Sequence, residues 1–240
     1  MNQLRLFILN SKGGCGKSTA AMYAFLVASM QKKPTHFLDL DNTSVTLTNF
    51  FNNIKDRKPE FIKSSSFSLL GKDNRIDRSK IDSFIEAIST LDYVIADFGA
   101  ESSNQFCQFL KEEAKNGIVQ TLNGLNVRIL LVFAGGGCAV DCLRFFELLK
   151  SVEGVKEITH IVANEYHGGF ENKTVTDFTK ATITLAPLTD DPLSEANIQF
   201  TQMLQKGVVY DEILKLSVIR KTRIIKHLEN FANQLENTIL

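Results

Sequence analysis

The first thirty residues place an apolar run, a glycine-rich loop and a helix-forming stretch in direct succession. The run spans Leu4 to Leu9, the loop reads Ser-Lys-Gly-Gly-Cys-Gly-Lys-Ser-Thr at positions 11–19, and Ala20 to Met30 follow. A strand, a tight turn and a helix in this order aim consecutive backbone N–H groups and the positive helix end at one anionic site. The sequence therefore predicts a phosphate-binding loop rather than a plain turn with solvated lysines, formed by Lys12, Gly13, Gly14, Cys15, Gly16, Lys17, Ser18 and Thr19.

Six strand-like apolar runs alternate with helical patterns along the chain. They are rich in Val, Ile, Leu and Phe almost without interruption, as expected for strands covered on both faces. This alternation predicts an α/β fold, a mainly parallel twisted sheet flanked by helices on both faces, in which ligands lie beyond the carboxyl ends of the strands. The runs are Leu4 to Leu9, His36 to Leu40, Tyr93 to Ala96, Val127 to Phe133, Ile158 to Val162 and Ala181 to Leu185.

Length and charge narrow the classes of protein that remain. The 240 residues fit a single domain over positions 1–240, and 44% hydrophobic with 22% charged residues is ordinary globular usage. Lys plus Arg equals Asp plus Glu at 27 each, so no overall field draws the chain to nucleic acid or to an acidic membrane. Any basic binding site must therefore be local.

The ends and the cysteines point to a cytoplasmic protein. The first strand begins almost at Met1 with no signal segment or helix-turn-helix before it, and no apolar run is long enough for a membrane span. The four cysteines show no disulfide framework, so thiols are expected. Cys138 and Cys142 are four residues apart, and buried thiols are favoured over a metal pair because two further ligands are missing.

Acidic residues end two of the apolar runs. Asp39 and Asp41 follow the second run, and Asp97 ends the third. Apolar residues that end in one acid have the form of a Walker B strand, whose carboxylate reaches Mg²⁺ through a water. Asp is also common in turns and helix caps, and for Asp39 and Asp41 alone the two interpretations are evenly matched. The phosphate-binding loop upstream favours a site.

The loop departs from the usual phosphate-binding pattern in a specific way. The common Gly-x-x-x-x-Gly-Lys-Ser/Thr pattern would place glycine at Ser11, whereas this chain has a lysine, Lys12, before two glycines. A lysine followed by Gly-Gly-x-Gly-Lys-Ser/Thr resembles the deviant Walker A ATPases of the ParA/MinD family and implies their P-loop fold. The resemblance further implies an ATP-sandwich homodimer, in which Lys12 reaches the partner subunit's nucleotide, Lys17 holds the phosphates of its own subunit and Ser18 binds Mg²⁺.

The same resemblance assigns roles to the acids. Asp39 and Asp97 would hold Mg²⁺ through water, and Asp41 would orient the attacking water, while the two lysines and the metal stabilise charge on the transferred group. The chain departs from the family after two of these acids. Asn and Thr follow Asp41 where Pro-Gln is common, and Phe-Gly-Ala-Glu follows Asp97 in place of a Thr-Pro-Pro switch segment.

Two residues further along are candidates for binding the base. The family has an adenine-reading asparagine at the strand end where Asn164 stands, and an amide pairs with both the donor and the acceptor edge of adenine. An ordinary turn asparagine is the alternative. Pro187 would line the base pocket. The resemblance runs from Leu4 to about Asn197, whereas residues 45–90 and 100–125 match no pattern of the family.

Residues 218–240 predict a C-terminal helix with a basic cluster at its start. By resemblance to partition ATPases, this cluster would bind nonspecific DNA. A helix docked on the core with solvated charges is equally compatible. A membrane helix of the MinD type is less favoured, because acids interrupt the second half. The cluster consists of Arg220, Lys221, Arg223 and Lys226.

The resemblance as a whole implies a Mg²⁺-dependent ATPase, slow and stimulated by a partner protein. Such an ATPase would act as a positional switch in plasmid or chromosome partition, or in plasmid stability or conjugation. Two alternatives remain. One is a membrane-associated positioning ATPase like MinD, and the other is a P-loop ligase of cofactor synthesis that uses ATP to activate a carboxylate. Those ligases generally lack the lysine found here at position 12.

Overall fold

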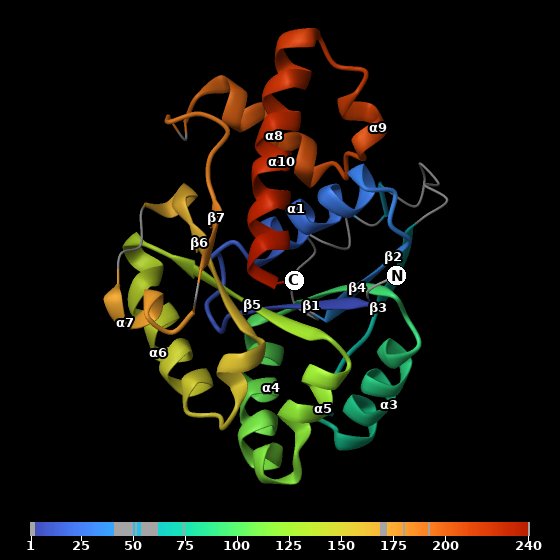
Figure 1. Cartoon of the computed structure of the whole chain (residues 1–240), viewed down its shortest axis with the longest axis vertical. Coiled ribbons are helices and arrows are strands. Elements are labelled where there is room, and N and C mark those ends of the chain that lie inside the picture. Colours follow the sequence, from blue (N-terminus) through green and yellow to red (C-terminus); the bar gives the residue numbers. More distant parts are fainter. Residues whose placement is uncertain are drawn as a thin grey trace.

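Seven parallel strands form the central sheet of the molecule (Figure 1). The computed structural model describes residues 3–40, 50, 52–53, 62–73, 75–168, 172–179, 181–191 and 193–239. Within these residues the strand order is β3-β2-β4-β1-β5-β6-β7, and each neighbouring pair is parallel. The strands are β1 Leu4–Leu9, β2 Thr35–Leu40, β3 Ile62–Ser66, β4 Tyr93–Phe98, β5 Val127–Ala134, β6 Thr159–Asn164 and β7 Thr182–Leu185.

Helices cover both faces of this sheet, as Figure 1 shows. One face is packed by α1 and α10, with α8 and α9 beyond them, and the other by α3, α4, α5 and α6. The predicted α/β fold is confirmed. The helices are α1 Lys17–Met30, α3 Arg78–Ser89, α4 Ala100–Glu113, α5 Ile118–Gly124, α6 Ala139–Lys150, α7 Lys173–Thr176, α8 Glu195–Gln205, α9 Tyr210–Ile213 and α10 Val218–Ile239, with 3-10 turns η1 Ala114–Asn116, η2 Gly136–Cys138, η3 Val155–Ile158 and η4 Glu165–His167.

Two strands differ from the sequence-based expectation. β3 was not predicted, because its sequence Ile-Lys-Ser-Ser-Ser lacks an apolar run; among the described strands it pairs with β2 alone, so it is an edge strand. Polar and charged residues are typical of such edges. β4 was expected to stop at Ala96, yet it continues to Phe98. Asp97 therefore lies inside the strand rather than after it.

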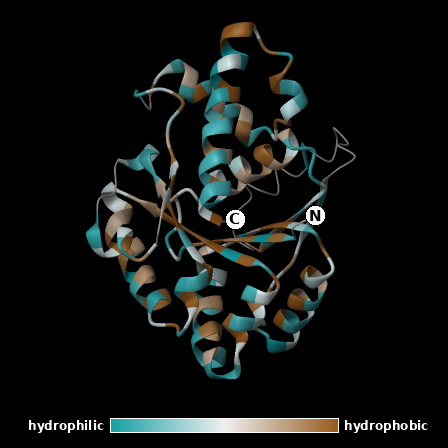
Figure 2. Cartoon of the chain, in the orientation of Figure 1, coloured by the Kyte–Doolittle hydropathy of each residue, from teal (hydrophilic) through white to brown (hydrophobic). Residues whose placement is uncertain are grey.

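Alternation along the strands sorts side chains between the two helical layers. Phe7 pairs in register with Ala96, and Ile8 with Asp97. The Phe7 ring packs among aromatic rings on the side of α3 and α4, with centroids 5.5 Å from Phe84, 5.4 Å from Phe98 and 5.7 Å from Phe106. Figure 2 shows that the strands carry much of the hydrophobic colour, while α10 is largely hydrophilic on the side turned to the viewer.

The amino ends of the strands, called here the amino edge of the sheet, contain a buried arginine, Arg5. This residue lies within the otherwise apolar run Leu4–Leu9, so the sequence pattern did not indicate its role. Arg5 has 0% of its surface exposed. Its guanidinium donates to the carbonyls of Ile88 at 2.6 Å, Ser89 at 2.9 Å and Leu91 at 2.7 Å, and also to the carbonyl of Leu125. It thus caps the ends of α3 and α5, whose last carbonyls have no partner within the helix.

The chain changes direction across the sheet at β1. It runs outward from β1 to β2 and β3, returns to β4 beside β1, and then continues on the other side through β5, β6 and β7. Ligands of open parallel sheets bind beyond the carboxyl ends of the strands at such a reversal. The glycine-rich loop leaves the carboxyl end of β1 between β4 and β5, which places it at this point.

Candidate functional site

The glycine-rich loop turns through two left-handed residues before α1 begins. Gly14 has φ +77° and Gly16 has φ +100°, a region that side-chain-bearing residues rarely adopt. A Cβ on Gly16 would also lie 2.1 Å from Nδ2 of Asn164, whereas one on Gly13 or Gly14 would have nothing within 4 Å. The backbone is therefore confined by β6 on one side and open on the other. The open side leaves room for an anion against the N–H groups of the loop.

Asn10 shapes the entry to the loop, and sequence reasoning missed it. Its side chain is fully buried: Nδ2 donates to the carbonyl of Val132 at 2.6 Å, and Oδ1 accepts from the backbone N–H of Lys12 at 2.7 Å. The second bond is the turn that an asparagine forms with the backbone two residues on. An asparagine between an apolar strand and a glycine loop was the available signal.

Two serines of α4 tie the carboxyl ends of neighbouring strands, although residues 100–125 had matched no pattern. The hydroxyl of Ser102 donates to the carbonyl of Leu40 at 2.7 Å. The backbone N–H of Asn10 donates to the Ser103 hydroxyl at 3.3 Å. Both serines are buried. The start of α4 therefore fixes the ends of β1 and β2, between which the site is built.

Lys17 is the first residue of α1 and is 8% exposed. Its ammonium donates to the carbonyl of Lys12 at 3.0 Å, which closes the loop on itself. A lysine at this place presents a compact positive charge at the positive end of a helix. The loop and helix start therefore concentrate positive potential around one small volume.

Ser18, Asp39 and Asp97 come together across three elements. The Ser18 hydroxyl donates to Oδ2 of Asp97 at 2.9 Å, and Asp39 pairs in register with Asp97 on the adjacent strand. Each aspartate is 1% exposed. Register neighbours in a parallel sheet point to the same face, here the face covered by α1. The structure thus brings these three predicted residues together, and their role in binding a metal stays a prediction.

This cluster fits a divalent cation. Two adjacent buried carboxylates are costly unless positive charge accompanies them, and hydroxyl and carboxylate oxygens are the donors that Mg²⁺ prefers. Within the residues that the structure describes, no group of three or more His, Cys, Asp or Glu gathers as a metal site. A cation here would rely on the Ser18 hydroxyl as well as the two acids. Asp41, predicted to orient water, lies outside the described residues.

Lys12, the lysine that sets the loop apart, is paired with an acid of α6. Its ammonium lies 2.9 Å from Oδ2 of Asp141, and the two side chains are 37% and 38% exposed. The hydrogen bond with Asp141 raises the pKa of Lys12 and lowers the pKa of Asp141. Arg144 also approaches Asp141, at 3.4 Å. Sequence reasoning missed Asp141, since nothing local to α6 signals a contact with the loop.

The Asn164 amide links the glycine-rich loop to the η4 turn that follows β6. Nδ2 donates to the carbonyl of Cys15 at 2.8 Å, and Oδ1 accepts from the backbone N–H of Tyr166 at 3.1 Å. The residue is 1% exposed. Recognition of adenine by Asn164 stays a prediction, and the observed contacts add a second role, because they hold the loop against β6. Pro187 lies in the segment that follows β7 and is half-buried.

A cluster of polar side chains links α1 and the η4 turn after β6 to the C-terminal helix α10. The Tyr23 hydroxyl on α1 lies 2.9 Å from the Tyr166 hydroxyl and 2.9 Å from Nε2 of His227 on α10. Burial raises the pKa of Tyr23 well above its usual value and lowers the pKa of His227. Both groups therefore stay neutral near pH 7, and the cluster fixes α10 against α1 and η4.

The predicted basic cluster on α10 is divided by the geometry of the helix. Adjacent helical residues point about 100° apart, so Lys221 points in a different direction from Arg220 and lines neither of the two hollows described next. Arg220 and Arg223 line one hollow, and Arg223 and Lys226 line the next. The helix expected over residues 218–240 corresponds to α10, Val218–Ile239, in the described residues. A DNA surface made by all four residues stays a prediction.

The thiols are free, and one of them lies in the loop. Cys15 and Cys142 are fully buried and Cys107 is buried, while Cys138 is half-buried. A hydrogen bond with Cys142, together with burial, raises the pKa of Cys15. Cys15 therefore stays a neutral thiol that packs the loop against α6.

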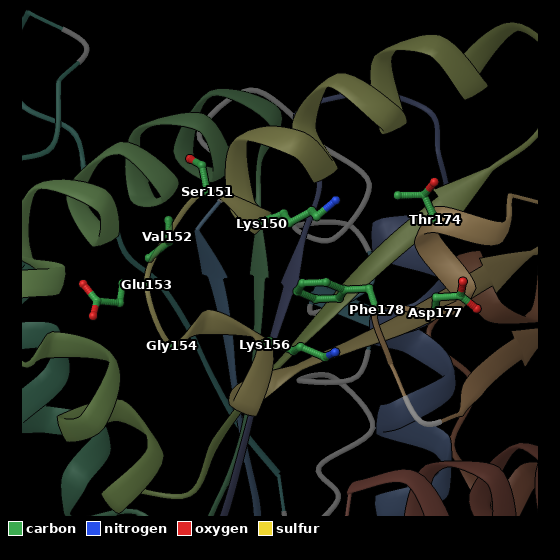
Figure 3. Close-up of a pocket in the computed structure, with 9 residues that line it drawn as sticks. All are labelled: Lys150, Ser151, Val152, Glu153, Gly154, Lys156, Thr174, Asp177 and Phe178. Atoms are coloured by element: carbon green, nitrogen blue, oxygen red, sulfur yellow. The ribbon is translucent and has the colours of Figure 1, made fainter.

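A separate hollow of about 610 Å³ lies at the amino ends of the strands, away from the glycine-rich loop (Figure 3). In Figure 3, Lys150 and Lys156 stand on either side of the Phe178 ring. Lys156 Nζ is 5.8 Å from the centre of that ring, and Lys150 Nζ is 5.6 Å from the centre of Phe146. The lysines thus cover aromatic rings. This hollow contains none of the residues that form the loop site.

The strand, the glycine-rich loop and the helix have the arrangement of a phosphate-binding loop, with two acids at the ends of neighbouring strands. No protein-family model and no curated protein sequence matches the chain. Among solved structures, a chain of the MinC:MinD cell division protein complex of Aquifex aeolicus is similar, with a TM-score of 0.56 and 15% identity over 98% of this chain and 96% of that one. In the described residues, no helix is long and apolar enough to cross a membrane.

Two further solved structures share the fold. A ParA family ATPase from Chlorobium tepidum TLS has a TM-score of 0.54 and 18% identity, covering 98% of this chain and all of that one. A protein of Borrelia burgdorferi B31 described as a plasmid partition protein, solved with AMPPNP, has a TM-score of 0.52 and 13% identity, covering 97% and 99%. At these identities the likeness establishes the fold, which is that of the ParA and MinD ATPases.

Proposed function

We propose that this protein is a Mg²⁺-dependent ATPase that dimerises around ATP and acts as a cytoplasmic positional switch for plasmid or chromosome cargo. The observation that carries the proposal is the pair of lysines on one phosphate-binding loop, Lys17 directed into the loop and Lys12 directed away from it toward Asp141. One lysine suffices to hold a nucleotide within a subunit. A second, on the rim, has a use when another subunit's phosphates approach it.

The chain's own residues would then act as follows. The backbone N–H groups of Gly13 to Lys17 and the α1 terminus bind the phosphates. Ser18, Asp39 and Asp97 would hold Mg²⁺, which when bound neutralises phosphate charge. Lys12 would leave Asp141 and reach the partner subunit's nucleotide. Two of the structural relatives, described as a ParA family ATPase and as a plasmid partition protein solved with AMPPNP, support the nucleotide and the role.

The test is ATP-dependent dimerisation followed by light scattering. Lys12→Ala is expected to bind a fluorescent ATP analogue as the wild type does and to remain monomeric with ATP. Asp141→Asn is the matched control, since it removes the partner of Lys12 but leaves the lysine, and it should dimerise at an ATP concentration about two- to fivefold lower. An ATP dimer of Lys12→Ala equal to that of the wild type would refute the proposal.

DNA binding by the ATP dimer is tested separately by fluorescence anisotropy of a random duplex, with ATP and with ADP at two salt concentrations. Binding confined to ATP and steeply weakened by salt would mean that the ATP dimer contacts phosphates, for which Arg220, Lys221, Arg223 and Lys226 are the candidate residues. Binding to anionic vesicles instead would favour the membrane alternative. A monomer that forms ADP only when given a carboxylate metabolite would favour the ligase alternative.

A further inference from the structure

Exposed hydrophobic side chains gather at the α8, α9 and α10 end of the molecule. Six large hydrophobic side chains are strongly exposed among the described residues, and one of them, Val140, lies outside this region. The others are Leu193, Ile198, Leu214, Val218 and Ile219, with Val218 at 72% and Ile219 at 68%. Scattered exposed hydrophobic residues are normal, so these side chains indicate an interaction site only together with a hollow that accepts a partner. Figure 2 shows the hydrophobic colour at the end of α10 that carries Val218 and Ile219.

A groove between α8 and the first turns of α10 includes one of these exposed side chains, Ile219, in its lining. It has a volume of about 340 Å³, and its apolar lining includes Phe200 and Met203 from α8 and Leu216 and Ile224 from the α10 side. Phe200 is 1% exposed and Ile224 is 4% exposed, so they form the floor. Ile219 stands on the rim. A groove of this size admits side chains of one face of a segment, since a whole helix is about 10–12 Å across.

The rim of the groove is cationic. Arg220 and Arg223 line it, opposite one acid, Glu195. Within the described part of the chain, neither guanidinium has an ion pair or a hydrogen bond, whereas Arg5, Arg78 and Arg144 all do. Two available guanidiniums above an apolar floor suit carboxylates that flank apolar side chains, because arginine binds carboxylates with two parallel hydrogen bonds.

We propose that the groove between α8 and α10 docks a short segment of a partner protein, in which apolar side chains alternate with acidic ones. The proposal rests on the proposed function, which requires a partner, and it names the chemistry of that partner. DNA offers phosphates but no side chains to fill the apolar floor. A membrane is a flat surface and does not enter a concave groove. The recessed floor and the charged rim together therefore favour a peptide.

The experiment uses the full chain and two fluorescent helical peptides of the same length. Both carry Leu at helical positions i, i+3, i+4 and i+7; one has Glu at the flanking positions and the other has Lys. The acidic peptide is expected to bind by anisotropy and the basic one not to bind. Met203→Glu and Arg223→Glu should each weaken binding by about tenfold. Lys221→Glu is the matched control on the same helix, and it should leave the affinity unchanged.

Four results would overturn the proposal. Equal binding of the two peptides would show that the groove does not select acidic side chains. Equal weakening by Lys221→Glu and Arg223→Glu would show that the peptide does not bind specifically at Arg223. A random duplex or anionic vesicles that bind at Arg223 while the acidic peptide does not would assign the surface to nucleic acid or lipid. A nucleotide-independent dimer that Ile219→Asp dissolves would assign it to a second copy of this chain. Ile219 is 68% exposed, so this variant should fold.

Binding of the fluorescent ATP analogue is measured for every variant, which separates the two proposals. If the wild type fails to bind the acidic peptide but binds ATP and dimerises with ATP normally, the docking groove alone is overturned. Loss of ATP binding in the wild type with intact peptide binding overturns the ATPase alone.

Discussion

Polar side chains are buried at both ends of the strands, the amino edge and the carboxyl edge of the sheet, but the groups that surround them differ between the two. At the amino edge, Arg5 is surrounded by backbone carbonyls that it caps. At the carboxyl edge, Asp39 and Asp97 are placed side by side on adjacent strands. The arginine is surrounded by groups of opposite polarity, whereas the two neighbouring acids carry like charge, which a bound cation would offset. Complementary burial at one edge therefore supports the fold, and like charge at the other suits a cation.

The largest expected effect of a substitution lies at the amino edge. Arg5→Met keeps the length of the side chain but leaves several buried carbonyls without a donor, so the free energy of unfolding should fall by about 3–5 kcal/mol. Urea denaturation measures this, and Arg78→Met provides a control because Arg78 is 63% exposed and forms surface pairs. A loss no greater than that of the control would show that the two edges do not differ in this way.

The matching change at the carboxyl edge should affect binding rather than folding. Lys17→Ala removes the ammonium at the start of α1, and the affinity for a fluorescent ATP analogue should fall by about 10- to 150-fold, the equivalent of one charge-assisted contact. Its urea midpoint should stay near that of the wild type. A large drop in stability with little change in affinity would reverse the comparison.

The amino edge should also respond to acid. Burial, followed by the charge of Arg128, lowers the pKa of His160 to about 4, and an unfolded histidine has a pKa of about 6.5. Below about pH 6.5 His160 binds a proton in the unfolded chain but not in the folded chain. The free energy of unfolding therefore falls as the pH is lowered from about 6.5 to about 4. The loss from this group should be on the order of 2 kcal/mol. The measurement compares the free energy of unfolding of the wild type and of His160→Gln as a function of pH. Parallel curves for the two proteins would contradict the prediction.

The smallest effect has the opposite sign. Asp97→Asn removes one of two adjacent buried charges while an oxygen remains for the Ser18 hydroxyl, so the nucleotide-free protein should gain about 0.5–2 kcal/mol. The same variant should lose the dependence of ATP binding on Mg²⁺. Thermal melting with and without Mg²⁺ and ATP tests both points, with exposed Asp211→Asn as the control. A destabilised variant would mean that Asp97 supports the fold as Arg5 does.

The sequence predicted those parts of the molecule that depend on neighbours along the chain. The phosphate-binding loop, its flanking strand and helix, and the acids at strand ends follow from local pattern. Asp141, Ser102 and Ser103 escaped prediction, since each acts on an element distant in sequence. Arg5 was read as part of an apolar run, because its carbonyl partners come from residues 88–125. Edge strand β3 lacked an apolar signal, since it is not covered as the central strands are.

The central position of β1 also bears on how the protein is made. Of the strands in the sheet, β1 is synthesised before β4 and β5, yet these two are its sheet partners, and the Asn10 side chain donates to the carbonyl of Val132. At about 5–20 residues per second, roughly 5–20 s separate synthesis of Leu9 from that of Phe98. During that interval the nascent chain holds an unpaired apolar strand, and the glycine-rich loop lacks the strands that position it. The loop is thus expected to reach its folded form only after β4 and β5 are made, although it is translated before them.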